Sequence, residues 1–165
     1  MERTLIGIIF FKQVKCTLTY GGLSMYINET KIKVRYVETD QMGIVHHSNY
    51  FAWFEVGRTE FFEETGLSYR EIEEQGIFFP LIESACQYKE GAKYQDEIII
   101  KTWIQALGGV RATFYYEVIR EKDYKTLATG KTVHAFVNRA FKPINLKKVN
   151  PKVWEKLEYL YSLEV

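Results

Sequence analysis

The stretch NYFAWFEVGRTEFFEETG, residues 49–66, sets the organisation of the chain. Its apolar residues and one glycine recur at intervals of three and four, the spacing of one helix face: Tyr50, Trp53, Phe54, Gly57 and Phe61. Gly66 supplies a C-terminal stop. So much of this helix is apolar that it must be largely buried. Gly57 costs about 1 kcal/mol of helix propensity relative to alanine, so we predict that it marks a close approach to another backbone.

Segments with strand character lie on both sides of this helix. Residues 26–37, YINETKIKVRYV, alternate between basic residues on one face and Ile32, Val34 and Tyr36 on the other, which predicts a half-buried strand. Four further runs follow the helix, at residues 78–90, 96–107, 110–121 and 126–139. The short connections between them predict antiparallel neighbours.

Two more helices complete the pattern. SYREIEEQG, residues 68–76, is short and polar and ends at Gly76. In NPKVWEKLEYLYSL, residues 150–163, Asn150 is a cap, Pro151 takes the first helical position, and an apolar stripe follows: Val153, Trp154, Leu157, Leu160 and Tyr161. The order of strand, long buried helix, four strands and helix predicts an α+β fold, in which one antiparallel sheet buries the long helix.

Composition restricts the classes of partner. The 165 residues include 22 basic and 21 acidic ones, so a net charge of +1 gives no global attraction for nucleic acid. The two cysteines, Cys16 and Cys86, lack the spacing of a metal knuckle or a disulfide framework, which favours a reducing, cytoplasmic location. We interpret Cys86 as a small buried side chain rather than a nucleophile.

Residues 1–24 form a distinct N-terminal extension. Their apolar run, LIGIIFF, is too short for a signal-peptide core and far short of a membrane span. Gly21 and Gly22, just before Met25, are what a ribosome-binding site would encode if it were translated. We therefore expect residues 1–24 to lie upstream of a start at Met25, and residues 25–165 to form one domain. The alternative is an additional apolar strand or helix.

The segment VETDQMGIVHHSNY, residues 37–50, carries the candidate chemistry. Asp40 is an anion at neutral pH and lies between a predicted strand and the start of the buried helix. Unpaired N–H groups at a helix start stabilise a developing oxyanion, so an acyl carbonyl there would be polarised beside a carboxylate. A carboxylate is a modest nucleophile, which suits a thioester better than an amide. The alternative is a loop or N-cap aspartate that only satisfies backbone donors.

A metal site is the other alternative for this segment. Asp40, His46 and His47 could bind a metal ion together with His134. Their spacing matches no recurrent metal signature, so we expect no metal.

The motif ETDQMGIVHHSNYFAWFEVGR, residues 38–58, resembles the signature of hot-dog-fold acyl-CoA thioesterases of the hydroxybenzoyl-CoA type, most closely the branch associated with the Tol-Pal gene cluster. The likeness runs from about Lys31 to Asn145. It implies a long helix wrapped by a curved antiparallel sheet of about five strands, to which this chain adds a C-terminal helix. It also implies dimers joined edge to edge, often paired into tetramers, with active sites at the subunit interface.

The resemblance assigns roles to individual residues. It implies that Asp40 is the catalytic carboxylate and that the backbone N–H of His47 binds the thioester carbonyl. Ser48, Asn49 and Tyr50 shape the turn and are candidate substrate-binding residues. No metal or redox cofactor is implied, because coenzyme A is part of the substrate. Glu38 and His46 receive no role.

Further candidates lie outside the motif's first half. Glu55 and Arg58 are three apart on the helix and could pair, as substrate-binding residues or as a structural ion pair. Asp96 is interpreted as a turn residue. Arg139 and Lys142, with Lys147 and Lys148, form a basic cluster where the family places CoA phosphates; a solvated face is the alternative.

We predict a cytoplasmic acyl-CoA thioesterase that forms a homodimer or homotetramer, with acyl carrier protein as a further candidate partner. The hydroxybenzoyl-specific enzymes usually have an aromatic residue at the position of His47, whereas histidine is typical of the branch that acts on aliphatic acyl-CoAs. The alternative function is a hot-dog domain that binds acyl-CoA or acyl carrier protein without turnover.

Overall fold

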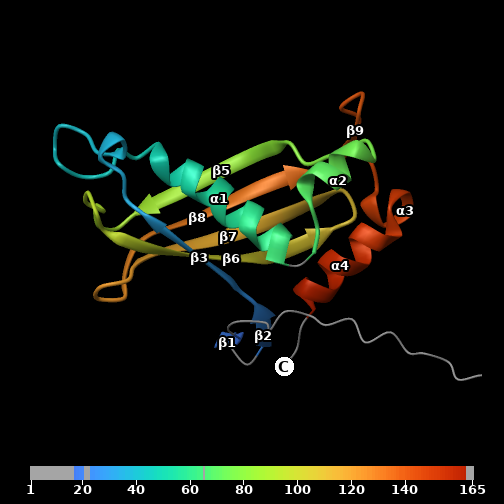
Figure 1. The fold of residues 1–165 in the computed structure, drawn as a ribbon. Coiled ribbons are helices and arrows are strands. Elements are labelled where there is room, and N and C mark those ends of the chain that lie inside the picture. Colours follow the sequence, from blue (N-terminus) through green and yellow to red (C-terminus); the bar gives the residue numbers. More distant parts are fainter. Residues whose placement is uncertain (1–16, 21–22, 65, 163–165) are drawn as a thin grey trace, which may run out of the picture.

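The computed structural model describes residues 17–20, 23–64 and 66–162, and its centre is one long helix lying across a twisted sheet (Figure 1). The helix is α1, Asn49–Glu64. The five strands are antiparallel, in the order β3 (Asn28–Lys33), β6 (Glu97–Gly108), β7 (Arg111–Arg120), β8 (Lys125–Ala135) and β5 (Leu81–Tyr88). The predicted α+β architecture and the predicted long helix are confirmed.

Shorter elements surround this unit. They are β1 (Thr17–Tyr20), β2 (Leu23–Tyr26), the 3-10 helix η1 (Tyr36–Glu38), α2 (Tyr69–Glu74), β4 (Ile77–Phe78), β9 (Val137–Asn138), α3 (Leu146–Val149) and α4 (Pro151–Tyr161). β1 pairs with β2, and β4 with β9. Residues 1–16 lie outside the described residues, and the domain boundary at Met25 stays a prediction. No helix within the described ranges combines the length and the apolar character of a membrane span.

The caps and stripes of the helices follow the sequence closely. Asn150 accepts a hydrogen bond from Val153 N at 3.2 Å, with Pro151 in the first turn of α4. Four residues of the predicted stripe are buried, but Tyr161 is 45% exposed and does not belong to it. Gly66 and Gly76, after α1 and α2, have positive φ angles of 69° and 81°, as the predicted stops require.

α1 lies very close to the sheet at Gly57. A Cβ atom on Gly57 would lie 2.6 Å from Thr102 Oγ1 and 2.9 Å from Ile100 Cγ2, both on β6. The predicted close approach is confirmed, although the neighbouring atoms belong to side chains rather than to a backbone. One turn earlier, Phe54 stacks on Tyr116 with ring centroids 4.4 Å apart.

The prediction that β5 and β6 are antiparallel neighbours is wrong. β5 pairs with β8 at one edge of the sheet, whereas β6 pairs with β3 and β7. The connection, residues 89–96, instead crosses the start of α1, where Val45 N donates to Ala92 O at 2.8 Å and Ala92 N donates to Tyr50 Oη at 3.3 Å. We call residues 89–96 the strap. A short connection can join distant strands here because the strap passes over the helix end.

The predicted strand at residues 26–37 is too long. β3 ends at Lys33 and η1 begins at Tyr36, so Tyr36, which the alternation places on the apolar face, is 76% exposed. The chain turns here because the Glu38 carboxylate accepts hydrogen bonds from Arg35 N at 2.7 Å and from Trp53 Nε1 of α1 at 3.0 Å.

Gly57→Ala tests the contact between α1 and β6. Alanine in a helix ordinarily gains about 1 kcal/mol over glycine, but the added methyl group would force Ile100 and Thr102 apart. Overpacking of this kind costs about 1–3 kcal/mol, so we expect the free energy of unfolding in urea to fall. Gly108→Ala is the control, because its Cβ would meet only Arg111 O at an ordinary 3.6 Å. A more stable Gly57→Ala variant would contradict the close contact.

Candidate active site

Asp40 lies in a tight loop between η1 and α1. Thr39 and Val45 form a bridge across the base of the loop. Inside it, Asp40 N donates to Ile44 O and Gly43 N donates to Asp40 O, each at 2.9 Å, and Gly43 has a φ of +74°. Asp40 Oδ1 accepts a hydrogen bond from Met42 N at 2.8 Å. One carboxylate oxygen therefore satisfies a backbone donor of the loop, as the alternative interpretation of Asp40 predicts. The other, Oδ2, has no hydrogen-bond partner among the described residues.

The backbone N–H of His47 is available at the start of α1. Its neighbours are all engaged: His46 N donates to Glu38 O, Ser48 N to His46 Nδ1, Asn49 N to His46 O and Tyr50 N to His47 O. Within the part of the chain that the structure describes, His47 N–H has no such partner. It lies two residues before α1, so it presents a free donor at the positive end of the helix dipole.

A cavity of about 210 Å³ brings these groups together. Its lining comes from the Asp40 loop, the helix start, the end of β5 and the strap: Asp40, Met42, Ile44, Val45, His47, Tyr50, Tyr88, Lys89, Glu90 and Gly91. Of the predicted site residues, Asp40, His47 and Tyr50 meet here. The cavity is thus bounded by an anionic carboxylate and by the segment that carries a free N–H.

Tyr88 is a residue of the cavity that the sequence did not indicate. Its hydroxyl donates to His47 O at 3.1 Å, and its ring meets the Tyr50 ring edge to face at 5.2 Å. Burial, reinforced by the neighbouring Cys86, raises the pKa of Tyr88 to about 12, so the phenol keeps its proton at neutral pH. Burial also raises the pKa of Cys86, a free thiol packed against the core, in agreement with its predicted structural role.

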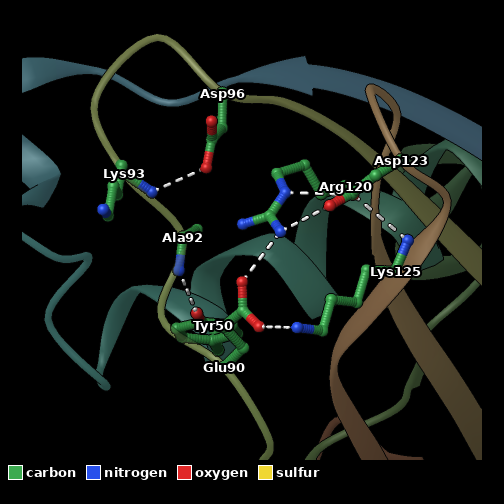
Figure 2. A network of polar contacts seen from close by, with 8 residues as sticks. All are labelled: Tyr50, Glu90, Ala92, Lys93, Asp96, Arg120, Asp123 and Lys125. Carbon is green, nitrogen blue, oxygen red and sulfur yellow. Dashed lines mark hydrogen bonds and ion pairs between the residues drawn. The ribbon is translucent and has the colours of Figure 1, made fainter.

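The strap wall of the cavity is anchored by ion pairs, shown in Figure 2. Glu90 accepts from Arg120 Nη2 at 2.8 Å and pairs with Lys125, while Asp123 holds Arg120 from the other side at 2.7 Å. Hydrogen bonds from Lys125 and Arg120 hold the pKa of Glu90 below its usual range. The strap is also closed on itself by Asp96, whose carboxylate accepts from Lys93 N at 2.8 Å, which confirms Asp96 as a turn residue.

Ser48 and Asn49 face the loop rather than the cavity. Ser48 Oγ contacts His46 Nδ1 at 2.8 Å. The Asn49 amide donates to Glu38 O at 2.9 Å and to His46 O at 3.3 Å. Both residues therefore shape the turn, and contact with a substrate stays a prediction for them.

The predicted pairing of Glu55 with Arg58 is wrong. Arg58 Nε donates to Tyr69 Oη at 2.8 Å and Nη1 to Tyr116 Oη at 3.4 Å, while Glu55 is exposed. The phenols of the buried Tyr116 and the half-buried Tyr69 outweigh the local carboxylate because Arg58 points between α1 and the sheet. Neither Glu55 nor Arg58 lines the Asp40 cavity.

The basic cluster lies at the other end of the molecule. Arg139 and Lys142 flank the turn after β9, which Figure 1 shows opposite the loop that precedes α1. Arg139 Nη2 donates to Glu74 O at 3.0 Å, and Lys147 pairs with Glu158 at 3.7 Å. Within one chain these cations do not meet Asp40, and their role toward a substrate stays a prediction.

His134 is separated from His46 and His47. It is buried on β8, where Nδ1 bonds Phe79 O at 2.9 Å and Nε2 bonds Thr132 Oγ1 at 3.0 Å. No group of three histidine, cysteine or acidic residues in the described ranges is arranged to hold a metal ion. The residues of the alternative metal site are therefore not brought together.

The fold and the cavity define a class of protein: a buried helix wrapped by an antiparallel sheet, with a carboxylate and a free N–H at the helix start. The family model of the thioesterase-like superfamily matches residues 34–155. YneP of Bacillus subtilis, provisionally named an acyl-CoA thioesterase, is 32% identical over 127 residues, 77% of this chain and 92% of YneP. The acyl-CoA thioesterase YbgC of Haemophilus influenzae is 27% identical, over 71% of this chain and 86% of YbgC.

A solved structure agrees with these relatives. The crystal structure of the DHNA-CoA thioesterase from Staphylococcus aureus matches with a TM-score of 0.78 and 34% identity, over 81% of this chain and 90% of that one. The chain belongs to the thioesterase-like superfamily. The predicted hot-dog fold is confirmed, as is the predicted class of enzyme, a thioester hydrolase.

His134→Gln tests the buried histidine. Burial, reinforced by the Arg58 cation, lowers the pKa of His134 from 6.5 to about 4. Between pH 6.5 and 4, His134 therefore binds a proton in the unfolded chain but not in the folded chain. The free energy of unfolding falls as the pH is lowered through this window. The loss attributable to His134 is about 3 kcal/mol. We expect urea unfolding of His134→Gln to depend less steeply on pH in this window; an unchanged slope would contradict the assignment.

Proposed function

We propose that the protein is an acyl-CoA thioesterase that hydrolyses the thioester to a free carboxylic acid and coenzyme A. The observation that carries the proposal is the convergence of the Asp40 carboxylate and the unpartnered His47 N–H at one cavity, at the start of α1. The names of YneP, YbgC and the Staphylococcus aureus enzyme support CoA thioesters as the substrate class. The motif at residues 38–58 favours the Tol-Pal-associated branch, and His47 favours an aliphatic acyl group.

In the proposed reaction the acyl carbonyl accepts the His47 N–H, and the helix dipole stabilises the negative charge that develops on the carbonyl oxygen. Asp40 Oδ2 faces no competing donor, so it can take a proton from water as the water oxygen attacks the carbonyl carbon. The carbon–sulfur bond then breaks, and the thiolate receives that proton. Direct attack by Asp40, followed by hydrolysis of the anhydride, uses the same carboxylate.

We propose no metal or redox cofactor for this reaction, since coenzyme A enters as part of the substrate. The free Cys86 thiol supports the proposed cytoplasmic location. Acyl carrier protein, as an alternative carrier of the acyl group, belongs to the same proposal because it presents the same thioester chemistry.

We further propose that two copies join along β5. β5 is the last strand of the sheet, so it pairs with β8 along one backbone edge only. Its side chains are exposed along almost its whole length, including Leu81 at 54% and Ile82 at 57%. An open edge strand of eight residues with apolar side chains invites pairing with another strand. A two-fold axis would pair β5 with its own copy, and two such dimers would form the proposed tetramer.

This pairing would unite the separated parts of the predicted site. Tyr88, at the end of β5, lines the cavity, while Leu81, at its start, follows β4, the partner strand of β9. In an antiparallel pair the start of one β5 lies beside the end of the other. The Arg139 and Lys142 side chains of a second copy would then lie near the first copy's cavity, where they could bind the phosphates of coenzyme A.

Asp40→Asn tests the reaction. Asparagine keeps an oxygen for Met42 N, so the loop should persist while the anion is lost. Removing a general base costs about 10²- to 10⁴-fold, so we expect kcat to fall by that factor while the melting temperature is nearly unchanged. Thiol release is measured against short, medium, long and aromatic acyl-CoAs. Glu155→Gln, the same loss of a carboxylate at an exposed position of α4 outside the cavity, is the control and should keep its turnover within about twofold.

Two outcomes would contradict the proposed function. Turnover by Asp40→Asn at the wild-type rate would remove Asp40 from the reaction. Saturable binding of acyl-CoA without thiol release by the wild-type protein would favour the non-catalytic binding domain.

Subunit mixing tests the shared site. Arg139→Ala/Lys142→Ala should raise KM for acyl-CoA, and Asp40→Asn should be inactive. In a mixed dimer of the two variants, one site would combine Asp40 from the Arg139→Ala/Lys142→Ala subunit with Arg139 and Lys142 from the Asp40→Asn subunit, so this site would be unaltered. We expect co-expression to restore turnover with the wild-type KM. Mixtures that show no more than the activity of the separate variants would place each site within one chain.

A further inference from the structure

Glu38 is a buried carboxylate that the reaction itself does not use. It lies two residues before Asp40 and is only 4% exposed. Oε2 accepts from Arg35 N at 2.7 Å, and Oε1 accepts from Trp53 Nε1 at 3.0 Å and from Arg35 Nη2 at 3.1 Å. Both carboxylate oxygens are therefore occupied by donors, and one donor belongs to α1.

The backbone of Glu38 is engaged as well. Its carbonyl oxygen accepts from His46 N and from Asn49 Nδ2, each at 2.9 Å. His46 is the residue before the free His47 N–H, and Asn49 is the first residue of α1. One residue thus binds the beginning of the Asp40 loop, the far end of that loop and the helix behind it.

These bonds fix the separation of the two reactive groups. The loop of residues 39–46 starts after Glu38 and returns to it at His46, with the Thr39–Val45 bridge across the base. Asp40 lies two residues after Glu38. His47 lies one residue after His46, which is hydrogen-bonded to the Glu38 carbonyl oxygen. If the carboxylate bonds to Arg35 and Trp53 are lost, the loop keeps the backbone bonds of Glu38 and the bridge, and Asp40 can shift against α1.

The electrostatic setting is consistent with a permanently charged anchor. Burial raises the pKa of Glu38, but hydrogen bonds from Arg35 N, Trp53 and the Arg35 guanidinium outweigh burial and hold it below its usual range. Glu38 is therefore an anion throughout the neutral range, and its hydrogen bonds are of the stronger, charge-assisted kind.

We propose that Glu38 is a positioning residue for the thioester hydrolysis described above: through Trp53, Arg35, His46 and Asn49 it holds the Asp40 carboxylate and the His47 N–H in their productive arrangement. The inference rests on the proposed function. Glu38 does not line the cavity and touches no reacting atom, so it acts only through the residues that it holds.

Glu38→Gln and Trp53→Phe test this role. Glutamine keeps the size of the side chain but places an NH2 group against one of the donors, and phenylalanine keeps a ring in the core but removes the indole N–H. A displacement near 1 Å costs about 100-fold, so we expect kcat to fall about 10- to 100-fold in Glu38→Gln and less in Trp53→Phe. KM should change less than about threefold, because the cavity lining is intact.

A stability control separates positioning from a general loss of structure. Leu157→Ala removes a fully buried side chain of α4, far from Asp40 in the sequence and outside the cavity. It should lower the melting temperature at least as much as Glu38→Gln while keeping kcat within about twofold. Glu38→Gln and Trp53→Phe should also be non-additive in kcat when combined, since both release the same anchor.

The outcomes are distinct from those of the proposed function. Wild-type thiol release together with wild-type kcat in Glu38→Gln would overturn the positioning role alone, whereas no thiol release by the wild type would overturn the function. If Glu38→Gln does not fold, Trp53→Phe decides by the same split of kcat and KM. Fully additive losses in the double variant would likewise overturn the proposal.

Discussion

The close seating of α1 on the sheet is the constraint on which the rest of the molecule depends. Two glycines permit it from opposite sides. Gly57 lets the helix approach Ile100 and Thr102 on β6, and Gly130 on β8 leaves room for Phe54, whose Cζ would lie 2.3 Å from a Cβ there. Because the helix cannot slide in this packing, the position of its first turn is set by contacts in its middle. The strap is attached to that first turn through Tyr50. The start of the Asp40 loop is attached to the next turn through the hydrogen bond of Trp53 to Glu38.

Hydrogen bonding explains why one donor is left for chemistry. The first N–H groups of a helix have no partners within the helix. In this chain the N–H groups of Ser48, Asn49 and Tyr50 find acceptors within the turn at residues 46–50, and His46 N donates to Glu38 O. The His47 N–H has no such partner among the described residues. Tyr88 holds the same turn from the side of β5 through the carbonyl of His47. The free donor is thus a consequence of how the turn closes, and the same closure brings Asp40 to the cavity that His47 also lines.

The parts that the sequence predicted are those governed by local rules. The period of α1, the Asn150 cap and the glycine stops depend only on neighbours in the chain, and all are present. The sequence does not predict that β5 and β6 are apart in the sheet, because the strap reaches β6 by crossing a helix whose position depends on tertiary contacts. Arg58 was paired wrongly because the phenols of Tyr69 and Tyr116 come from distant segments. The sequence gives Glu38 no role, since a glutamate in a polar motif gives no sign that it accepts a hydrogen bond from the indole of Trp53.

The same constraint bears on the proposed pairing of two chains along β5. α1 covers the middle of the sheet, and the β5 residues that pair with Gly130 and Thr132, namely Cys86 and Ser84, lie at its margin. Cys86 still packs against the core, whereas Ser84 is exposed, so the covering by the helix fades along β5. One helix of this width cannot bury all five strands. A second copy across β5 would cover the exposed edge and the apolar residues at its start in a single step. Tyr88 of that same strand lines the cavity, so the edge where we propose that a second copy pairs adjoins the cavity where we propose that the substrate binds.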